Sequence, residues 1–208
     1  MFTKHDVLPL TLYEFELPDA LYIKTLKQCE SLDWEAIEHR DDKNHFGRTF
    51  DCLWHQQEEF QDLVKFIEDC LEEVRVEIKA SALGKLAVSS LWPNRSVKGE
   101  WHHGHTHNWS FLTGVIYIKG ITGNTWFSRE SEWEKITNFN MRREEEEQPL
   151  LIHKQSPKPG SMFVLPSNLF HSVDEVTEGE RITMSFNSFP SVSAGDITAY
   201  AGVNLKVL

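Results

Sequence analysis

The sequence predicts an α+β domain in which a sandwich or jelly roll of short strands carries helices on one side. Two observations lead to this prediction. Apolar residues recur at helical spacing in the first part of the chain, and from residue 86 onward the period changes to two. No repeat and no Pro/Gly/Ser-rich linker divides the chain. We therefore expect one domain over residues 1–208, with 1–85 as mainly helical support and 86–190 as the β core.

The N-terminal part is expected to open with a strand and to continue with helices. LPLTLYEFEL, at 8–17, alternates apolar and polar residues as an edge strand does, and Pro18 ends it. Asp19 is a candidate N-cap for a helix over ALYIKTLKQCESL. From Gln56 to about Lys79, apolar residues recur at steps of three and four, which predicts a long amphipathic helix.

The β core is predicted from short runs rich in β-branched and aromatic residues, namely LAVSSLW, FLTGVIYI, NTWFS, SMFVLP and RITMSFN. In RITMSF, alternation places Arg181, Thr183 and Ser185 on one face and the apolar residues on the other. An arginine on an inward polar face requires an anion opposite it, because an unpaired buried charge is costly. The fork of a guanidinium suits a carboxylate.

Composition narrows the classes of function and compartment. The net charge of −11, from 21 basic and 32 acidic residues, disfavours a nucleic-acid partner. We expect no membrane segment, because no apolar run approaches the roughly 20 residues that a span needs, and the N-terminus lacks a signal-peptide core. Three scattered cysteines fit a reducing cytoplasm. The acidic run REEEE, at 143–147, is interpreted as a solvated face.

Four histidines fall within six positions in WHHGHTHN, residues 101–108. On an extended strand, residues two apart point to the same side, so His105 and His107 converge. Two imidazoles so placed can reach one metal ion at about 2.0 to 2.2 Å. The alternative is a polar surface on which the histidines stack with Trp101 and Trp109.

The chain resembles the 2-oxoglutarate- and Fe(II)-dependent oxygenases over about residues 86–190. Such enzymes carry H-x-D/E at a strand end, a distal His and a basic residue about ten positions later. Here these elements fall on His105-Thr106-His107, His171 and Arg181. WPNRSVKGEWHHGHTHNWSFLTGVIYI, FVLPSNLFHSV and ERITMSFN also resemble a narrower group of uncharacterised oxygenases with an H-x-H motif. The resemblance implies a double-stranded β-helix, a jelly roll of the cupin type, with the N-terminal helices packed against it.

The resemblance also implies a role for each site residue. His105, His107 and His171 would hold Fe(II), and Arg181 would bind the C5 carboxylate of 2-oxoglutarate. Tyr117 is a further candidate for that carboxylate, unless it is an ordinary cross-strand aromatic residue. Asn94, Thr183 and Ser185 are weaker candidates.

His107 departs from the wider superfamily, which has Asp or Glu at that position. All-histidine iron sites exist in cupin-like dioxygenases, so iron binding is still expected, with one more unit of positive charge at the centre. The alternative is a carboxylate from Glu100 or Asp174, although neither has the expected spacing.

The expected function is a dioxygenase that consumes 2-oxoglutarate and O₂, releases succinate and hydroxylates a small molecule or a protein side chain. Two alternatives stay open: a three-histidine dioxygenase without 2-oxoglutarate, and a non-catalytic jelly-roll binding module. The segment 128–156 is the expected source of substrate specificity. The sequence does not predict the oligomeric state.

Overall fold

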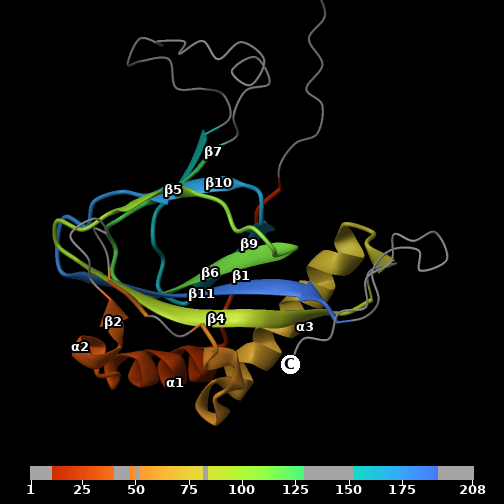
Figure 1. Ribbon diagram of the computed structural model, residues 1–208, viewed down its shortest axis with the longest axis horizontal. Helices are drawn as coiled ribbons and strands as arrows, with labels where there is room; N and C mark the ends of the chain where they lie inside the picture. Colours follow the sequence, from red (N-terminus) through yellow and green to blue (C-terminus); the bar gives the residue numbers. More distant parts are fainter. Residues whose placement is uncertain (1–10, 40–46, 50–51, 82–83, 129–151, 192–208) are drawn as a thin grey trace, which may run out of the picture.

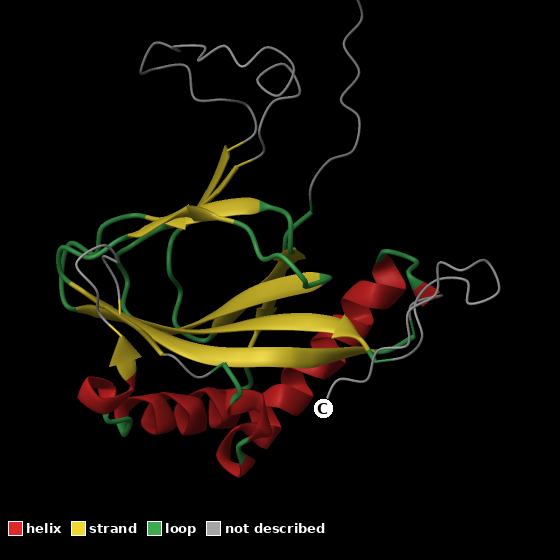
Figure 2. Ribbon diagram, viewed as in Figure 1, coloured by secondary structure: helices red, strands yellow, loops and turns green. Residues whose placement is uncertain are grey.

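The computed structural model describes residues 11–39, 47–49, 52–81, 84–128 and 152–191. Two antiparallel sheets lie one above the other, and the helices cover the outer face of the larger sheet (Figures 1 and 2). This arrangement confirms the predicted α+β class, with helices on one side of a double layer of strands.

The two sheets are named here by size. The major sheet has the strand order β1-β9-β6-β11-β4-β3-β2, and the minor sheet has the order β5-β10-β7-β8. The major-sheet strands are β1 (Tyr13–Glu16), β2 (Glu38–His39), β3 (Gly47–Thr49), β4 (Leu86–Val97), β6 (Leu112–Lys119), β9 (Ser161–Pro166) and β11 (Glu180–Pro190). The minor-sheet strands are β5 (His102–His105), β7 (Thr125–Ser128), β8 (Ile152–Gln155) and β10 (Phe170–Val173). Successive strands thus alternate between the sheets along much of the chain.

The two predicted helices begin at other residues than the sequence predicts. Helix α1 (Asp19–Glu30) has Pro18 in the N-cap position, so the prediction of Asp19 as the cap was wrong. Asp19 instead adds a negative charge to the first turn, where the helix dipole favours it. The long helix predicted from Gln56 starts at Gln61, because two 3-10 turns precede it. The helical elements are α1, α2 (Trp34–Ile37), η1 (Trp54–Gln56), η2 (Glu58–Phe60) and α3 (Gln61–Glu77).

The main core lies between the helices and the outer face of the major sheet. Helix α3 contributes Leu63, Ile67 and Leu71, each at most 1% exposed, to the same apolar cluster as Met184 and Phe186 of β11. Burial of one such side chain contributes roughly 1.5–3 kcal/mol. The apolar face of β11 is therefore held against the helices, and its polar face turns the other way, toward the minor sheet.

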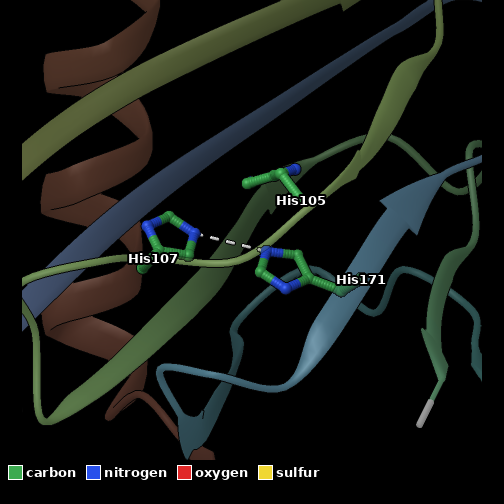
Figure 3. Close-up of side chains that lie close together, drawn as sticks. All are labelled: His105, His107 and His171. Atoms are coloured by element: carbon green, nitrogen blue, oxygen red, sulfur yellow. Dashed lines mark hydrogen bonds between the residues drawn. The ribbon is translucent and has the colours of Figure 1, made fainter. Parts of the chain in front are cut away.

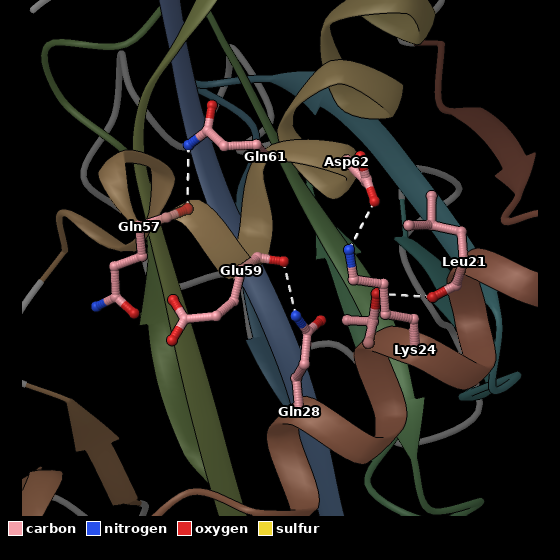
Figure 4. Close-up of polar contacts among 8 residues, drawn as sticks. Leu21, Lys24, Gln28, Gln57, Glu59, Gln61 and Asp62 are labelled. Carbon is pink, nitrogen blue, oxygen red and sulfur yellow. Dashed lines mark hydrogen bonds and ion pairs between the residues drawn. The ribbon is translucent and has the colours of Figure 1, made fainter.

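Polar contacts fix how α1 meets the start of α3 (Figure 4). Lys24 pairs with Asp62 at 2.6 Å, and the Gln28 amide donates to the carbonyl of Glu59 at 2.6 Å. Both partners of the ion pair are well exposed, so it contributes no more than about 1 kcal/mol. These contacts orient the two helices, and the apolar core supplies the stability.

Residues 1–85 do more than the predicted helical support, because β1, β2 and β3 add strands to both edges of the major sheet. Strand β1 is the predicted edge strand, and it pairs with β9 alone. The acidic run at 143–147 and most of the segment 128–156 lie outside the described residues. No helix in the described ranges has the length and apolar character that crossing a bilayer requires.

Candidate active site

A cavity of about 480 Å³ lies between the two sheets. Its floor is formed by alternate residues of β4 and β11, on the face opposite the helices. Its roof is formed by residues of β5, β7 and β10 and by the turn that follows β5. The volume lies in the range of small-molecule sites, roughly 300–1,000 Å³.

The structure brings His105, His107 and His171 together under this roof (Figure 3). His105 and His171 stand opposite each other in the β5–β10 pairing, with ring centroids 4.4 Å apart. His107 lies two residues beyond the end of β5, and its ring is parallel to that of His171 at 5.1 Å. One ring nitrogen from each residue lies within 4.8 Å of the other two. The three side chains can therefore surround a single ion.

Backbone carbonyls fix the orientation of two of these rings. Nδ1 of His105 donates to the carbonyl of His103 at 3.0 Å, and Nδ1 of His171 donates to the carbonyl of Leu169 at 2.9 Å. Because a carbonyl only accepts, the proton must be on Nδ1 in both residues. Each Nε2 then keeps a lone pair. Such a second hydrogen bond is usual for a metal-binding histidine.

Burial keeps the rings uncharged near neutral pH. It lowers the pKa of His107 to about 3 and that of His171 to about 4, with the neighbouring histidines adding to the effect. The pKa of His105 is also lowered, again mainly by burial. The Nε2 atoms of His107 and His171 are 3.3 Å apart. With the His171 proton on Nδ1, the Nε2–H of His107 donates to the Nε2 of His171 in this contact. Neutral imidazole is the form in which histidine binds a metal.

No carboxylate joins this cluster in the part of the chain that the structure describes. Glu100 accepts a hydrogen bond from the backbone N–H of Val97 at 2.7 Å. Asp174 accepts from the side chains of Asn124 and Trp126, at 3.1 and 2.5 Å. Neither acidic residue lines the cavity. The alternative in which Glu100 or Asp174 replaces His107 is therefore not supported.

Arg181 lies on the floor of the cavity, and only 5% of it is exposed. Its Nη2 donates to the hydroxyl of Thr125 at 3.3 Å, while its Nε is buried without a partner among the described residues. Burial lowers the pKa of the guanidinium, but an arginine keeps its charge in proteins. A buried cation with no carboxylate opposite it among the described lining residues is costly, and an anionic ligand would offset that cost.

Thr183 lines the cavity beside Arg181, as predicted, and is 1% exposed. Tyr117 takes a different place: it is fully buried but does not line the cavity. Its hydroxyl lies 2.7 Å from that of Thr125, and the Arg181 guanidinium carbon lies 5.3 Å from the centre of its ring. Tyr117 thus lies behind the cavity wall, in contact with both Thr125 and Arg181, which line it.

Several lining residues were not predicted from the sequence. Thr125 and Phe127 of β7 line the cavity. They alternate with Trp126 in NTWFS, and this alternation could have placed them on the same face of the strand. On β11, the alternation of Arg181, Thr183 and Ser185 continues to Asn187, which also lines the cavity. Asn94, a weaker candidate, donates to the Ser185 hydroxyl at 3.1 Å. Further lining residues are Ser90, Trp92, Ser96, His102 and Thr113.

The comparison with protein families gives one match. Residues 90–187 match the sequence profile of a family described as "Putative 2OG-Fe(II) oxygenase", where 2OG denotes 2-oxoglutarate. The matched range contains the three histidines and Arg181. No curated protein matches the sequence of the chain.

Solved structures of similar fold include three enzymes. A prolyl-4-hydroxylase from Pseudomonas putida gives a TM-score of 0.62 at 13% identity, covering 86% of this chain and 92% of that one. HygX from Streptomyces hygroscopicus, crystallised with nickel, 2-oxoglutarate and hygromycin B, gives 0.62 at 15% identity, covering 88% and 84%. The epimerase SnoN from nogalamycin biosynthesis gives 0.64 at 11% identity, covering 90% and 82%. At these identities the likeness shows the fold, and it confirms the predicted double-stranded β-helix.

Proposed function

We propose, from the match of residues 90–187 to the 2OG-Fe(II) oxygenase family, that His105, His107 and His171 hold the iron of such an enzyme. Arg181 holds the cosubstrate, and the enzyme uses O₂ to hydroxylate its substrate. The observation that carries this proposal is the meeting, in one cavity, of three neutral imidazoles and a buried guanidinium that has no carboxylate beside it among the described lining residues.

The donor set fits a divalent transition metal. Three imidazole nitrogens suit iron, and three protein ligands leave positions open for other molecules, as a catalytic metal requires. All three ligands are uncharged, so the metal keeps its full double charge. When bound, the metal and cosubstrate supply the activation of O₂, coupled to decarboxylation of 2-oxoglutarate to succinate.

The floor of the cavity fits a dicarboxylate. The guanidinium of Arg181 can form charge-assisted hydrogen bonds with the far carboxylate of 2-oxoglutarate, and its unpartnered Nε supports this role. The Thr183 and Thr125 hydroxyls line the cavity near it, and Tyr117 supports Thr125 from behind. These residues bind and orient the cosubstrate, while the minor sheet covers the site and limits access of water.

The substrate proposed is a small molecule or a protein side chain. The structural relatives support both classes, because one is a prolyl-4-hydroxylase and another was crystallised with hygromycin B. We also propose a reducing cytoplasm as the compartment, since Cys29, Cys52 and Cys70 form no disulfide in the structure.

The test is an anaerobic titration of the Fe(II) protein with 2-oxoglutarate, followed by visible absorption. A charge-transfer band that saturates with 2-oxoglutarate is expected. The Zn(II) protein is the matched control, because its filled d shell gives no such band. Stoichiometric iron without a band would favour a three-histidine dioxygenase that binds its organic substrate directly, and absence of iron binding would favour a binding module.

A further inference from the structure

The floor of the cavity is a continuous strip of side chains that runs along two paired strands. In the antiparallel register of β4 and β11, each lining residue of one strand faces a lining residue of the other. The pairs are Arg181 with Ser96, Thr183 with Asn94, Ser185 with Trp92, and Asn187 with Ser90. Arg181 lies at one end of this strip, and Asn187 lies at the other.

The histidine cluster meets this strip between its two ends. The ring of His107 is 5.8 Å from that of Trp92, and Trp92 pairs with Ser185, which is four positions from Arg181 and two from Asn187. Asn187 lies six positions along the strand from Arg181, which corresponds to roughly 20 Å. A five-carbon diacid anchored at Arg181 and reaching the histidines would leave the Asn187 end of the cavity free.

At that free end, Asn187 presents an unused acceptor. Its Oδ1 is buried and has no hydrogen-bond partner among the described residues. The neighbouring hydroxyl of Thr113 does not serve it, because that hydroxyl donates to the carbonyl of Phe186 at 2.7 Å. A buried acceptor without a donor destabilises a fold, so such groups in native proteins call for a partner from outside the chain.

The described residues around Asn187 carry no charge. Ser90, Trp92 and Thr113 line this end together with the thiol-bearing Cys52. The permanent cation of the cavity, Arg181, lies at the opposite end. A charged group of a ligand would therefore lose its hydration beside Asn187 without gaining an opposite charge from these side chains.

We propose that the Asn187 end of the cavity is the subsite for the prime substrate, and that Asn187 accepts a hydrogen bond from an uncharged O–H or N–H donor. The substrate is thus neutral at the part that enters this end, as in a polyol or an amide. This inference rests on the proposed function for its reaction, but the state of Asn187 can be tested without metal or cosubstrate.

The first experiment measures thermal unfolding of the metal-free protein. Asn187→Leu replaces the unpaired amide by an apolar group of similar size, and Asn168→Leu makes the same change at an exposed turn outside the cavity. We expect Asn187→Leu to raise Tm by about 2–4 °C, the shift that about 1 kcal/mol produces in a chain of this length. Asn168→Leu should not raise it. A lower Tm for both Asn187→Leu and the smaller Asn187→Ala would overturn the proposal.

The second experiment uses matched probes on the Zn(II) protein saturated with 2-oxoglutarate, with binding followed by ligand-observed NMR. Sorbitol is compared with gluconate, and N-acetylalanine amide with N-acetylalanine. The uncharged member of at least one pair should bind about tenfold more tightly, and Asn187→Leu should remove about that factor. The pair of probes in which the uncharged member binds more tightly shows whether the subsite takes a hydroxyl or an amide donor.

Equal binding of charged and uncharged members, no binding of either uncharged probe, or unchanged binding in Asn187→Leu would overturn the subsite. Failure of the proposed function is a different outcome, because the wild-type protein would then not bind 2-oxoglutarate. The affinity of Asn187→Leu for 2-oxoglutarate should equal that of the wild type, since its anchor is at the other end of the strip.

Discussion

The major and minor sheets differ in what stabilises them and in what they contribute to the site. The major sheet is packed on its outer face against α1 and α3 in a large apolar cluster. The cluster that includes minor-sheet residues contains Phe127, Leu165 and Leu169. Yet the minor sheet supplies His105 and His171, while the major sheet supplies Arg181. Stability is thus concentrated in one sheet, and most of the proposed metal binding in the other.

The comparison teaches that a well-packed floor can carry a site whose roof has a much smaller apolar cluster. An ion bound to His105, His107 and His171 would join β5, β10 and the turn after β5. Such an ion stabilises the folded form in proportion to the logarithm of its concentration over its Kd. Substitutions in the two sheets should therefore affect different measured quantities.

The largest effect is expected for His171→Ala, which removes a proposed metal ligand from the minor sheet. Iron binding and succinate release should be lost, while far-UV circular dichroism stays unchanged, because a catalytic metal contributes less to folding than a structural one. His153→Ala, at an exposed position of β8 in the same sheet, is the control and should retain both. Iron content and turnover like the wild type would end the assignment of His171 as a ligand.

A stability test sharpens the same comparison. Phe186 is fully buried on the apolar face of β11. Phe186→Ala should therefore lower the free energy of unfolding by about 3–5 kcal/mol. Phe170 of β10 is 39% exposed, and its change to Ala should cost about 1 kcal/mol. Urea denaturation of the metal-free variants measures both. Similar losses of unfolding free energy in the two variants would show that the minor sheet contributes as much to stability as the major sheet.

Arg181 tests the chemical contribution of the major sheet. Arg181→Lys keeps the charge but loses the fork, so the affinity for 2-oxoglutarate should fall by about ten- to a hundredfold, or roughly 1.4–2.7 kcal/mol. Arg181→Met should weaken it further, with iron binding little changed. Arg95→Lys is the control, because its guanidinium lies over Trp34. Equal anaerobic affinity in the wild type and Arg181→Met would refute the cosubstrate role.

The smallest effect is expected for His107→Asp, which restores the ligand usual in the superfamily. Fe(II) affinity should be retained or rise by up to about tenfold, because a carboxylate adds an attractive charge. His103→Asp adds the same charge at an exposed position outside the three-histidine cluster and should not reproduce a gain. Loss of iron in His107→Asp, measured by metal analysis, would show that His107 does something other than bind the metal.

The spacing of apolar residues in the sequence was sufficient to predict the strands and helices in which that spacing is regular. The alternation in RITMSF correctly placed Arg181 and Thr183 on the cavity side, and the three- and four-residue steps correctly gave the body of α3. The start of α3 was missed because Gln56 and Gln57 lie among two 3-10 turns, whose side chains follow a similar spacing.

Contacts between distant segments could not be predicted from period alone. Strand β10 is only four residues long, and it exists as a strand because it pairs with β5 on one side and β7 on the other. The position of Tyr117 behind Thr125 likewise depends on β6 and β7 approaching from different sheets. His55, to which no sequence motif points, is 8% exposed, and its Nδ1 has no hydrogen-bond partner among the described residues. Such details follow from tertiary packing.

Trp109 gives the protein a built-in optical probe. It is 94% exposed, the most exposed tryptophan in the described part of the chain, and it follows Asn108, which lines the cavity. An indole so placed emits at long wavelength and is open to collisional quenchers such as iodide. A ligand that covers the cavity beside Asn108 should protect this emission, and Trp109→Phe would remove its contribution to the fluorescence of the seven tryptophans. Substrate binding could then be followed in unlabelled protein, before any product is known.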